Sequence, residues 1–242
     1  LGTLTSDESL KPQVPAMDPR PVLTMRDMGM SMQDMDMSGM QMSNSSMPMQ
    51  NMDMSSMGSS AGMGSKQEIL HADTEFGPQV DMRSESPQSG LNDPGIGLRE
   101  HQSLYGRKVL TYADIHNLYT TIDTREPSRE IQLHLTGNMQ RYMWSMNGIP
   151  FSDAEPLRLT FGERVRFTLV NDTMMTHPIH LHGMWSELET GSALHMPRKH
   201  TVLVQPGSKI SYLVTADAKG NWAYHCHLLY HMMGMFREVV VS

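Results

Sequence analysis

Cysteine is almost absent from this sequence, with one residue in 242, so the chain cannot form an internal disulfide. A membrane-spanning helix is not expected either, because no apolar run reaches about 18 residues. The chain does not open with a basic and then apolar leader, so we expect any export signal to lie upstream of Leu1. The net charge of −7 argues against nucleic-acid binding and favours a cationic substrate.

The first hundred or so residues have little of the composition that a core needs, and branched and aromatic residues are almost absent from 25–63. Residues 1 to about 24 are polar and contain prolines, and fourteen methionines lie among small polar residues between Met25 and Met63. Such a segment buries too little apolar surface to offset the entropy of ordering it. Residues 64–103 continue as a Ser-, Pro- and Gly-rich linker. We therefore expect residues 1–103 to be disordered segment and linker, with a Met-rich tract at 25–63.

The Met-rich tract has a ligand chemistry of its own. Thioether sulfur is a soft ligand that selects Cu(I), and close spacing lets two or three sulfurs reach one ion. Two other interpretations stay open, a low-complexity linker and a scavenger of oxidants. The candidates for Cu(I) capture are Met28, Met30, Met32, Met35, Met37, Met40, Met42, Met47, Met49, Met52 and Met54.

From residue 104 to 242 the pattern changes to short β-rich runs separated by turn residues. This pattern predicts an all-β fold, an antiparallel Greek-key sandwich, and the length suffices for one core. Met139, Met143 and Met146 are expected to fill that core. The predicted strands are 108–112, 130–135, 141–144, 164–170, 201–204, 209–214, 221–225 and 235–241.

The single cysteine stands in the most informative stretch, His225-Cys226-His227. Successive side chains of a strand point to opposite faces, so Cys226 faces one way and both histidines the other. His231 and Met235 follow in the order Cys-x4-His-x3-Met. A thiolate, an imidazole and a weak axial thioether are what a blue-copper electron-transfer site needs, together with a second histidine.

His177 is the candidate for that second histidine, and it opens the motif His-Pro-Ile-His-Leu-His-Gly. Extended geometry aims His180 and His182 to one side, and we expect a bend at Pro178 to free His177 to point elsewhere. Each of the two motifs would then serve a mononuclear metal on one side and give two imidazoles to a second metal group. Six of the twelve histidines lie in these motifs, which favours ligands over ordinary polar residues.

The pattern H-P-x-H-x-H-G followed by H-C-H-x3-H and a methionine resembles the C-terminal copper motifs of multicopper oxidases. The surrounding sequence is most similar to the copper-resistance protein A branch, the periplasmic copper-detoxifying oxidases of bacteria. It runs GNMQRYMW at 137–144, HPIHLHGMWSELE at 177–189 and WAYHCHLLYHMMGMFREVVVS at 222–242. The resemblance covers residues 104–242 closely, and it implies a C-terminal cupredoxin domain and a periplasmic location.

The resemblance also implies a copper-binding role for each histidine of the two motifs, for Cys226 and for Met235. Electrons would enter at the type 1 copper and leave through Cys226 into His225 and His227, which makes these three residues the catalytic ones. The implied ligands are His177, Cys226, His231 and Met235 for type 1 copper, His180 for type 2 copper, and His182, His225 and His227 for the type 3 pair.

The sequence departs from the family pattern beyond Cys226. The family usually places one more residue before the axial methionine, so Met232 and Met233 stay alternatives to Met235. The acidic residue often found in this loop is missing. Glu187 and Glu189 are candidates for steering Cu(I) or an electron to the type 1 copper, although loop carboxylates are usually only solvated surface. Arg198, Lys199 and His200 are expected to be structural.

The chain holds only half of the family's trinuclear ligands. The family takes eight histidines from four H-x-H motifs, and two such motifs are present here. The remaining histidines are isolated and offer no further pair, namely His71, His101, His116, His134, His195 and His200. We therefore expect a C-terminal part of a longer oxidase, whose missing N-terminal cupredoxin domain or domains supply the other half.

Two functions of different class are compatible with these residues. The resemblance implies an oxidase that takes electrons from Cu(I) or a phenolic reductant and reduces dioxygen to water in copper resistance. The alternative is a non-enzymatic periplasmic copper-binding or electron-transfer protein that uses only the mononuclear site and the Met-rich tract. Two further H-x-H motifs upstream in the full-length protein would favour the oxidase.

Overall fold

The chain is described by a computed structural model for residues 5–11, 13, 16–30 and 60–242. Nine of the eleven methionines predicted to capture Cu(I), from Met32 to Met54, lie outside these residues. The helical elements are η1 (Met25–Met28), η2 (Asp73–Phe76), η3 (Gly90–Asn92), α1 (His101–Tyr105), η4 (Tyr112–Asp114) and η5 (Phe151–Asp153). The strands are β1 (Gln88–Ser89), β2 (Arg129–Asn138), β3 (Met143–Met146), β4 (Leu157–Leu159), β5 (Arg164–Asn171), β6 (His177–Leu181), β7 (Ser186–Leu188), β8 (Arg198–Lys199), β9 (Thr201–Val204), β10 (Ser208–Thr215), β11 (Gly220–Cys226) and β12 (Phe236–Val241).

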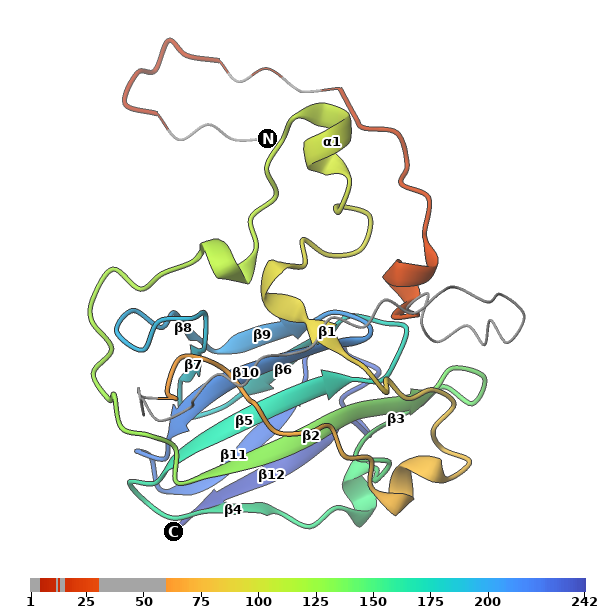
Figure 1. Ribbon diagram of the computed structural model, residues 1–242, viewed down its shortest axis with the longest axis vertical. Helices are drawn as coiled ribbons and strands as arrows, with labels where there is room; N and C mark the ends of the chain where they lie inside the picture. The colour runs from red at the N-terminus through yellow and green to blue at the C-terminus, as the bar shows by residue number, and fades with distance from the viewer. Residues whose placement is uncertain (1–4, 12, 14–15, 31–59) are drawn as a thin grey trace, which may run out of the picture.

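Two β-sheets pack face to face (Figure 1). In the described residues the larger sheet has seven strands, in the order β3-β2-β5-β10-β7-β8 with β1 added on β10. The smaller sheet has five strands, in the order β4-β12-β11-β6-β9. The sheets are mixed, because β2 runs parallel to β5 and β4 parallel to β12, so the all-β sandwich is confirmed and the purely antiparallel pairing is wrong.

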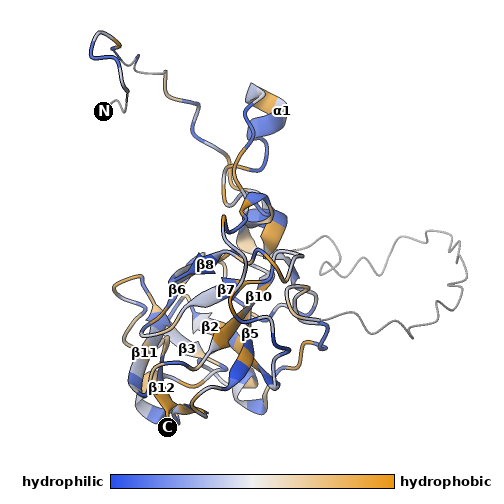
Figure 2. Ribbon diagram, turned by 90° about the vertical axis from the view of Figure 1, so that its left-hand side faces the viewer, coloured by the Kyte–Doolittle hydropathy of each residue, from blue (hydrophilic) through white to orange (hydrophobic). Residues whose placement is uncertain are grey.

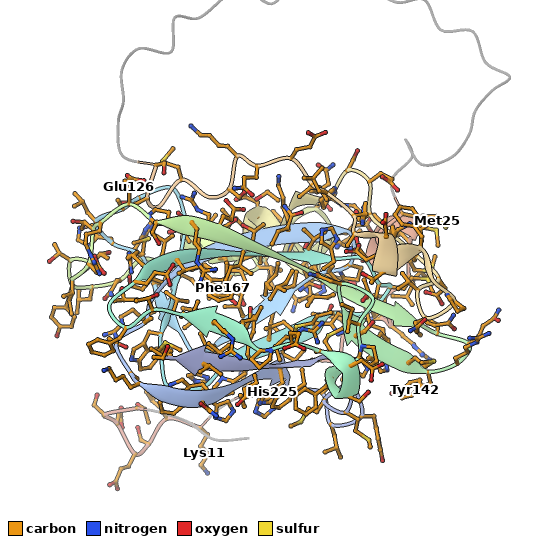
Figure 3. All side chains as sticks on the ribbon, turned by 90° about the horizontal axis from the view of Figure 1, so that it is seen from below. Lys11, Met25, Glu126, Tyr142, Phe167 and His225 are labelled. Atoms are coloured by element: carbon orange, nitrogen blue, oxygen red, sulfur yellow. The ribbon has the colours of Figure 1, made fainter. Side chains whose placement is uncertain are left out.

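The core between the sheets forms from alternate residues of the central strands. Figure 3 shows Phe167 between the two layers, and its ring packs on Tyr212 and Tyr224 at centroid distances of 5.9 and 5.6 Å. Met146 is fully buried in this core and Met139 packs against it, as predicted. Met143 is 37% exposed instead, because it lies at the start of β3.

The seven-stranded sheet is covered on its outer face as well. All eight residues of β5 are buried, so the polar side chains that alternate with its core residues are buried too. Arg166 donates to the Ser60 carbonyl at 2.9 Å, and Thr168 and Ser65 both bond to Glu130. Residues 60–89, which we call the strap, therefore lie along this sheet.

The strap differs from the linker that its composition predicts. Ala61 is buried with Met196 and Leu213, and β1 extends the sheet by pairing parallel to β10. Composition does not predict this packing, because polar contacts hold most of the strap. For example, Gly62 N–H donates to Glu189 at 2.9 Å. The domain boundary at residue 104 stays a prediction.

Other segments depart from the predicted strands or stand apart from the sandwich. Residues 108–112 form no strand, and β4, β7 and β8 are short strands that the pattern does not predict. Figure 2 shows α1 standing away from the two sheets. No helix in the described ranges is both long and apolar enough to cross a membrane.

Candidate metal centres

The pairing of β6 with β11 separates the predicted ligands into two groups. His225 lies opposite His180, and Cys226 lies opposite Ile179. His177 is in phase with Ile179, so alternation alone places it on the inner face with Cys226. Pro178 stays in register with β9, so the bend that we predicted there is wrong and is not needed to turn His177 inward.

The inner group brings three ligand atoms together. Cys226 Sγ lies 3.6 Å from His177 Nδ1 and 3.7 Å from His231 Nδ1, and the two nitrogens are 3.2 Å apart. Bonds of about 2.0 Å to imidazole and about 2.3 Å to thiolate give such separations around one ion in a roughly trigonal arrangement. All three residues are buried, at 1% exposure or less. The residues present therefore fit a mononuclear metal.

The loop after Cys226 carries the three axial candidates, and burial distinguishes them. Met235 is fully buried, Met232 is half-buried and Met233 is 85% exposed. The backbone of Met235 bonds both to Cys226 and to His231, at 3.0 and 2.8 Å. These contacts hold Met235 beside the two ligands and favour it as the axial donor.

Gly234 explains how this loop closes so tightly. A Cβ atom at this position would lie 1.9 Å from the Trp144 carbonyl oxygen, so only glycine fits against that backbone. The indole of Trp144 then stacks on the His231 ring at 3.8 Å and meets His177 edge-on at 5.4 Å. The stacked ring restricts the orientation of His231.

A chain of hydrogen bonds fixes His177, and sequence reasoning missed it. His177 Nε2 lies 2.6 Å from Thr173 Oγ1, which itself bonds to Asn171 Oδ1 at 2.9 Å. The Asn171 amide donates to the carbonyls of Met175 and Val204, so its oxygen must face Thr173. Thr173 then accepts the proton on Nε2, and His177 Nδ1 keeps its lone pair for the metal. The available signal was the polar run between β5 and the first histidine motif.

Burial sets the protonation of the inner group. It lowers the pKa of His177 to about 3, with a smaller contribution from His231, and lowers that of His231 to about 4. Burial raises the pKa of the Cys226 thiol to about 11. At neutral pH both imidazoles are therefore neutral and ready to bind, and the thiol must lose a proton to the incoming metal.

The outer group consists of His180, His182, His225 and His227. Their rings form a cluster with centroid distances of 4.5 to 5.7 Å for the contacting pairs. His182 and His227 are exposed, whereas His225 is 4% exposed, on the sheet that faces downward in Figure 3. The group therefore lies at the surface of the five-stranded sheet.

Backbone carbonyls orient two of these imidazoles. His180 Nδ1 lies 2.5 Å from the His200 carbonyl and His225 Nδ1 lies 2.9 Å from the Cys226 carbonyl, so each Nε2 is left for a ligand. His225 Nε2 and His182 Nε2 are 3.1 Å apart, close enough to bind one ion. Burial is the main cause that lowers the pKa of His182 and of His225, which keeps both neutral.

Glu187 and Glu189 are not the exposed loop carboxylates that the sequence indicated. Both are buried beside the seven-stranded sheet, where Glu189 accepts two bonds from Arg166 at 2.8 and 2.9 Å. Glu187 pairs with Arg164 at 2.8 Å. Each carboxylate thus neutralises a buried guanidinium, which accounts for both residues without a steering role.

A buried cysteine grouped with two imidazoles and a neighbouring methionine, held by a β-sandwich, is the arrangement of a cupredoxin domain. A family profile for multicopper oxidases matches residues 124–242. The chain belongs to the multicopper oxidase family, whose cofactor is copper.

Curated relatives match the whole chain. A copper resistance protein A homolog of Pseudomonas syringae pv. tomato is 56% identical, and copper resistance protein A of Escherichia coli is 53% identical. The chain covers 42% and 43% of these relatives, so it spans less than half of their length. Among solved structures, a blue copper oxidase from Nitrosomonas europaea aligns with a TM-score of 0.44 at 19% identity, over 48% of this chain and 44% of that one.

Replacing the hydroxyl that orients His177 should weaken metal binding. In Thr173→Val the proton on His177 Nε2 loses its acceptor, and loss of such a partner lowers metal affinity by about 10- to 100-fold. Competition with a copper chelator measures the change. Thr176→Val, which removes a nearby hydroxyl that bonds to Gln205 instead, should leave the affinity unchanged. Equal affinities for Thr173→Val and wild type would contradict the orienting role.

Copper(II) uptake by the metal-free protein should release one proton from the inner group between about pH 5 and pH 9. The pKa values of His177 and His231 lie below this window at about 3 and 4, while that of Cys226 lies above it at about 11. Affinity should therefore rise about tenfold per pH unit. Proton release measured in weak buffer, divided by the amount of copper that develops the visible band, gives the count. A count of two or three would mean that the histidines are protonated.

Proposed function

We propose that this chain is the C-terminal copper domain of an oxidase that takes single electrons from Cu(I) or a phenolic reductant and reduces dioxygen to water. The observation that carries the proposal is the position of Cys226. Its side chain belongs to the inner group, and its two neighbours in the chain belong to the outer group. The Cys226 backbone is thus a covalent connection between the two groups of ligands.

We assign the ligands by these two faces. The inner group would hold a type 1 copper through His177, Cys226 and His231, with Met235 as the weak axial donor. The outer group would give His180 to a type 2 copper and His182, His225 and His227 to the type 3 pair. Copper bound in these positions supplies one-electron redox chemistry at the inner group and oxygen chemistry at the outer group.

The exposure of the outer group supports a partner domain. His182 and His227 present imidazoles to solvent, and four histidines cannot complete the eight-histidine set of the family. The length of the relatives leaves room for an N-terminal cupredoxin domain that would cover this face. We propose that such a domain supplies the missing four histidines.

Cu(I) is favoured as a substrate by thioethers on the surface next to the inner group. Met233 is exposed two residues after His231, and Met143 is exposed next to Trp144, the residue that stacks on His231. Thioethers select Cu(I), and the negative charge of the chain attracts a cation. These methionines would present Cu(I) close to the ligand through which its electron enters.

The Met-rich tract would collect Cu(I) for this surface. Both ends of the tract contact the domain, because Gly29 packs against Gly207 and Ser60 bonds to Arg166. Met28 and Met30 belong to the described end, and the tract would add further thioethers to the same domain. In a periplasmic location, as proposed from the copper-resistance resemblance, oxidation of captured Cu(I) would serve copper resistance.

The oxidase and its non-enzymatic alternative differ in oxygen uptake by the full-length protein. We expect an intense visible charge-transfer band and oxygen uptake with Cu(I), both lost in Cys226→Ser because the thiolate is gone. His101→Gln, on the distant α1, should keep both. A visible band without oxygen uptake, for Cu(I) and for phenols, would favour the copper-binding or electron-transfer protein and contradict the oxidase.

Removing the tract should affect Cu(I) more than a phenol. Deleting residues 31–59 from the full-length protein leaves the inner group intact, so the visible band should persist while Cu(I) oxidation falls, since only Cu(I) uses thioether capture. Replacing the same residues by a Gly- and Ser-rich segment of equal length should give the same result. Equal losses for both substrates would show that the tract acts only as a linker.

A further inference from the structure

A second cluster of metal-binding side chains lies where the strap meets the seven-stranded sheet. His71 and Glu75 belong to the strap, His134 lies on β2, and Asp172 follows β5 directly. One ligand atom from each of the four residues lies within 4.8 Å of all the others. Their side chains are 7%, 1%, 2% and 0% exposed, respectively. The cluster is thus a closed, buried group of two imidazoles and two carboxylates.

The spacing of the four atoms suits one tetrahedral ion. Glu75 Oε2 lies 2.7 Å from His71 Nδ1 and 3.3 Å from His134 Nδ1. Asp172 Oδ2 lies 2.7 Å from His134 Nδ1 and 3.8 Å from His71 Nδ1. A tetrahedron with bonds of 2.0 to 2.1 Å has edges of roughly 3.3 Å, which these four separations bracket. An ion therefore fits with shifts of a few tenths of an ångström.

Gln132 reveals which nitrogen of His134 carries a proton. Gln132 Oε1 accepts from Leu70 N–H at 3.0 Å and Gln132 Nε2 donates to the Glu68 carbonyl at 3.2 Å, which fixes the orientation of the amide. The same Oε1 lies 3.1 Å from His134 Nε2, so Nε2 must donate to it. A neutral His134 then presents the lone pair of Nδ1 to Asp172 and Glu75. A lone pair facing two carboxylates is unfavourable, and either a second proton on the ring or a cation between the three groups relieves it.

The carboxylates are held in the same way, by their outer oxygens. Asp172 Oδ1 accepts from Ser84 N–H at 2.8 Å, and Glu75 Oε1 accepts from Ala72 N–H at 3.2 Å. Both inner oxygens are left to face the imidazoles. Metal-ligating residues commonly have such outer partners, which orient the ligand and raise its basicity. Two buried carboxylates also supply the charge that balances a divalent ion.

We propose that His71, Glu75, His134 and Asp172 form a structural site for a divalent first-row metal ion of the zinc type. Two nitrogens and two oxygens in a tetrahedral, closed set suit Zn²⁺, and the absence of sulfur from this cluster disfavours Cu(I). The ion would tie the strap to β2 and to the end of β5. The site is separate from the copper centres, because it lies on the seven-stranded sheet rather than on β6 and β11.

Zinc stoichiometry of the whole chain, with its type 1 copper already loaded, tests the proposal. The double variant His71→Gln with Glu75→Gln removes the two strap ligands and should bind one Zn²⁺ fewer than wild type. The matched control Glu100→Gln with His101→Gln removes the same two kinds of side chain near α1 and should bind as many as wild type. The visible band of the type 1 copper reports whether each variant is folded.

Two measurements on the wild type keep the proposal testable if the double variant does not fold. X-ray absorption of the first bound equivalents should include a zinc with two imidazoles and two carboxylate oxygens, whereas zinc in the exposed outer copper group would have imidazoles and water but no carboxylate. Zn²⁺ at about 100 times its dissociation constant should slow protease cleavage of the strap by about 100-fold. Equal zinc counts in the double variant and its control, or zinc coordination without carboxylate and with no protection of the strap, would show that the cluster is a hydrogen-bonded ion-pair network without metal.

Discussion

The alternation of side chains along β11 is the constraint on which the rest of the site depends. Three consecutive residues cannot all face one way in a strand, so Cys226 points into the sandwich while His225 points to the outer face of the sheet. The register with β6 repeats this separation, since His180 pairs with His225 and Ile179 pairs with Cys226. A one-residue slip would exchange the two faces and destroy both groups at once. The hydrophobic core, which fixes that register, therefore also determines the position of every ligand.

Burial and hydrogen bonding complete what alternation begins. A buried imidazole is neutral because the protein interior disfavours its charge, but neutrality alone does not decide which nitrogen is free. For His177 the decision comes from Thr173 and, through it, from Asn171. For His225 it comes from the carbonyl of the adjacent cysteine. The ligands are thus oriented by groups that belong to the same strands and loops.

The sequence predicts the parts of this structure that are local. The two histidine motifs, the separation of their faces and the sandwich itself follow from periods of two residues and from short spacings. The packing of the strap was not predictable, because the strap has few apolar residues. It is held instead by polar contacts of Ser60, Gly62 and Glu75 with groups far along the chain. His71 and His134 were isolated in sequence for the same reason, although their rings lie 4.7 Å apart.

The strap covers the outer face of the seven-stranded sheet, whereas the outer face of the other sheet exposes His182 and His227. The two sides of the sandwich therefore differ in how much surface they leave for a partner. One side is covered by the strap, whose strand β1 also pairs with β10. If the proposed partner domain exists, it can therefore complete the metal cluster from one side only, because contact on the other side meets the strap.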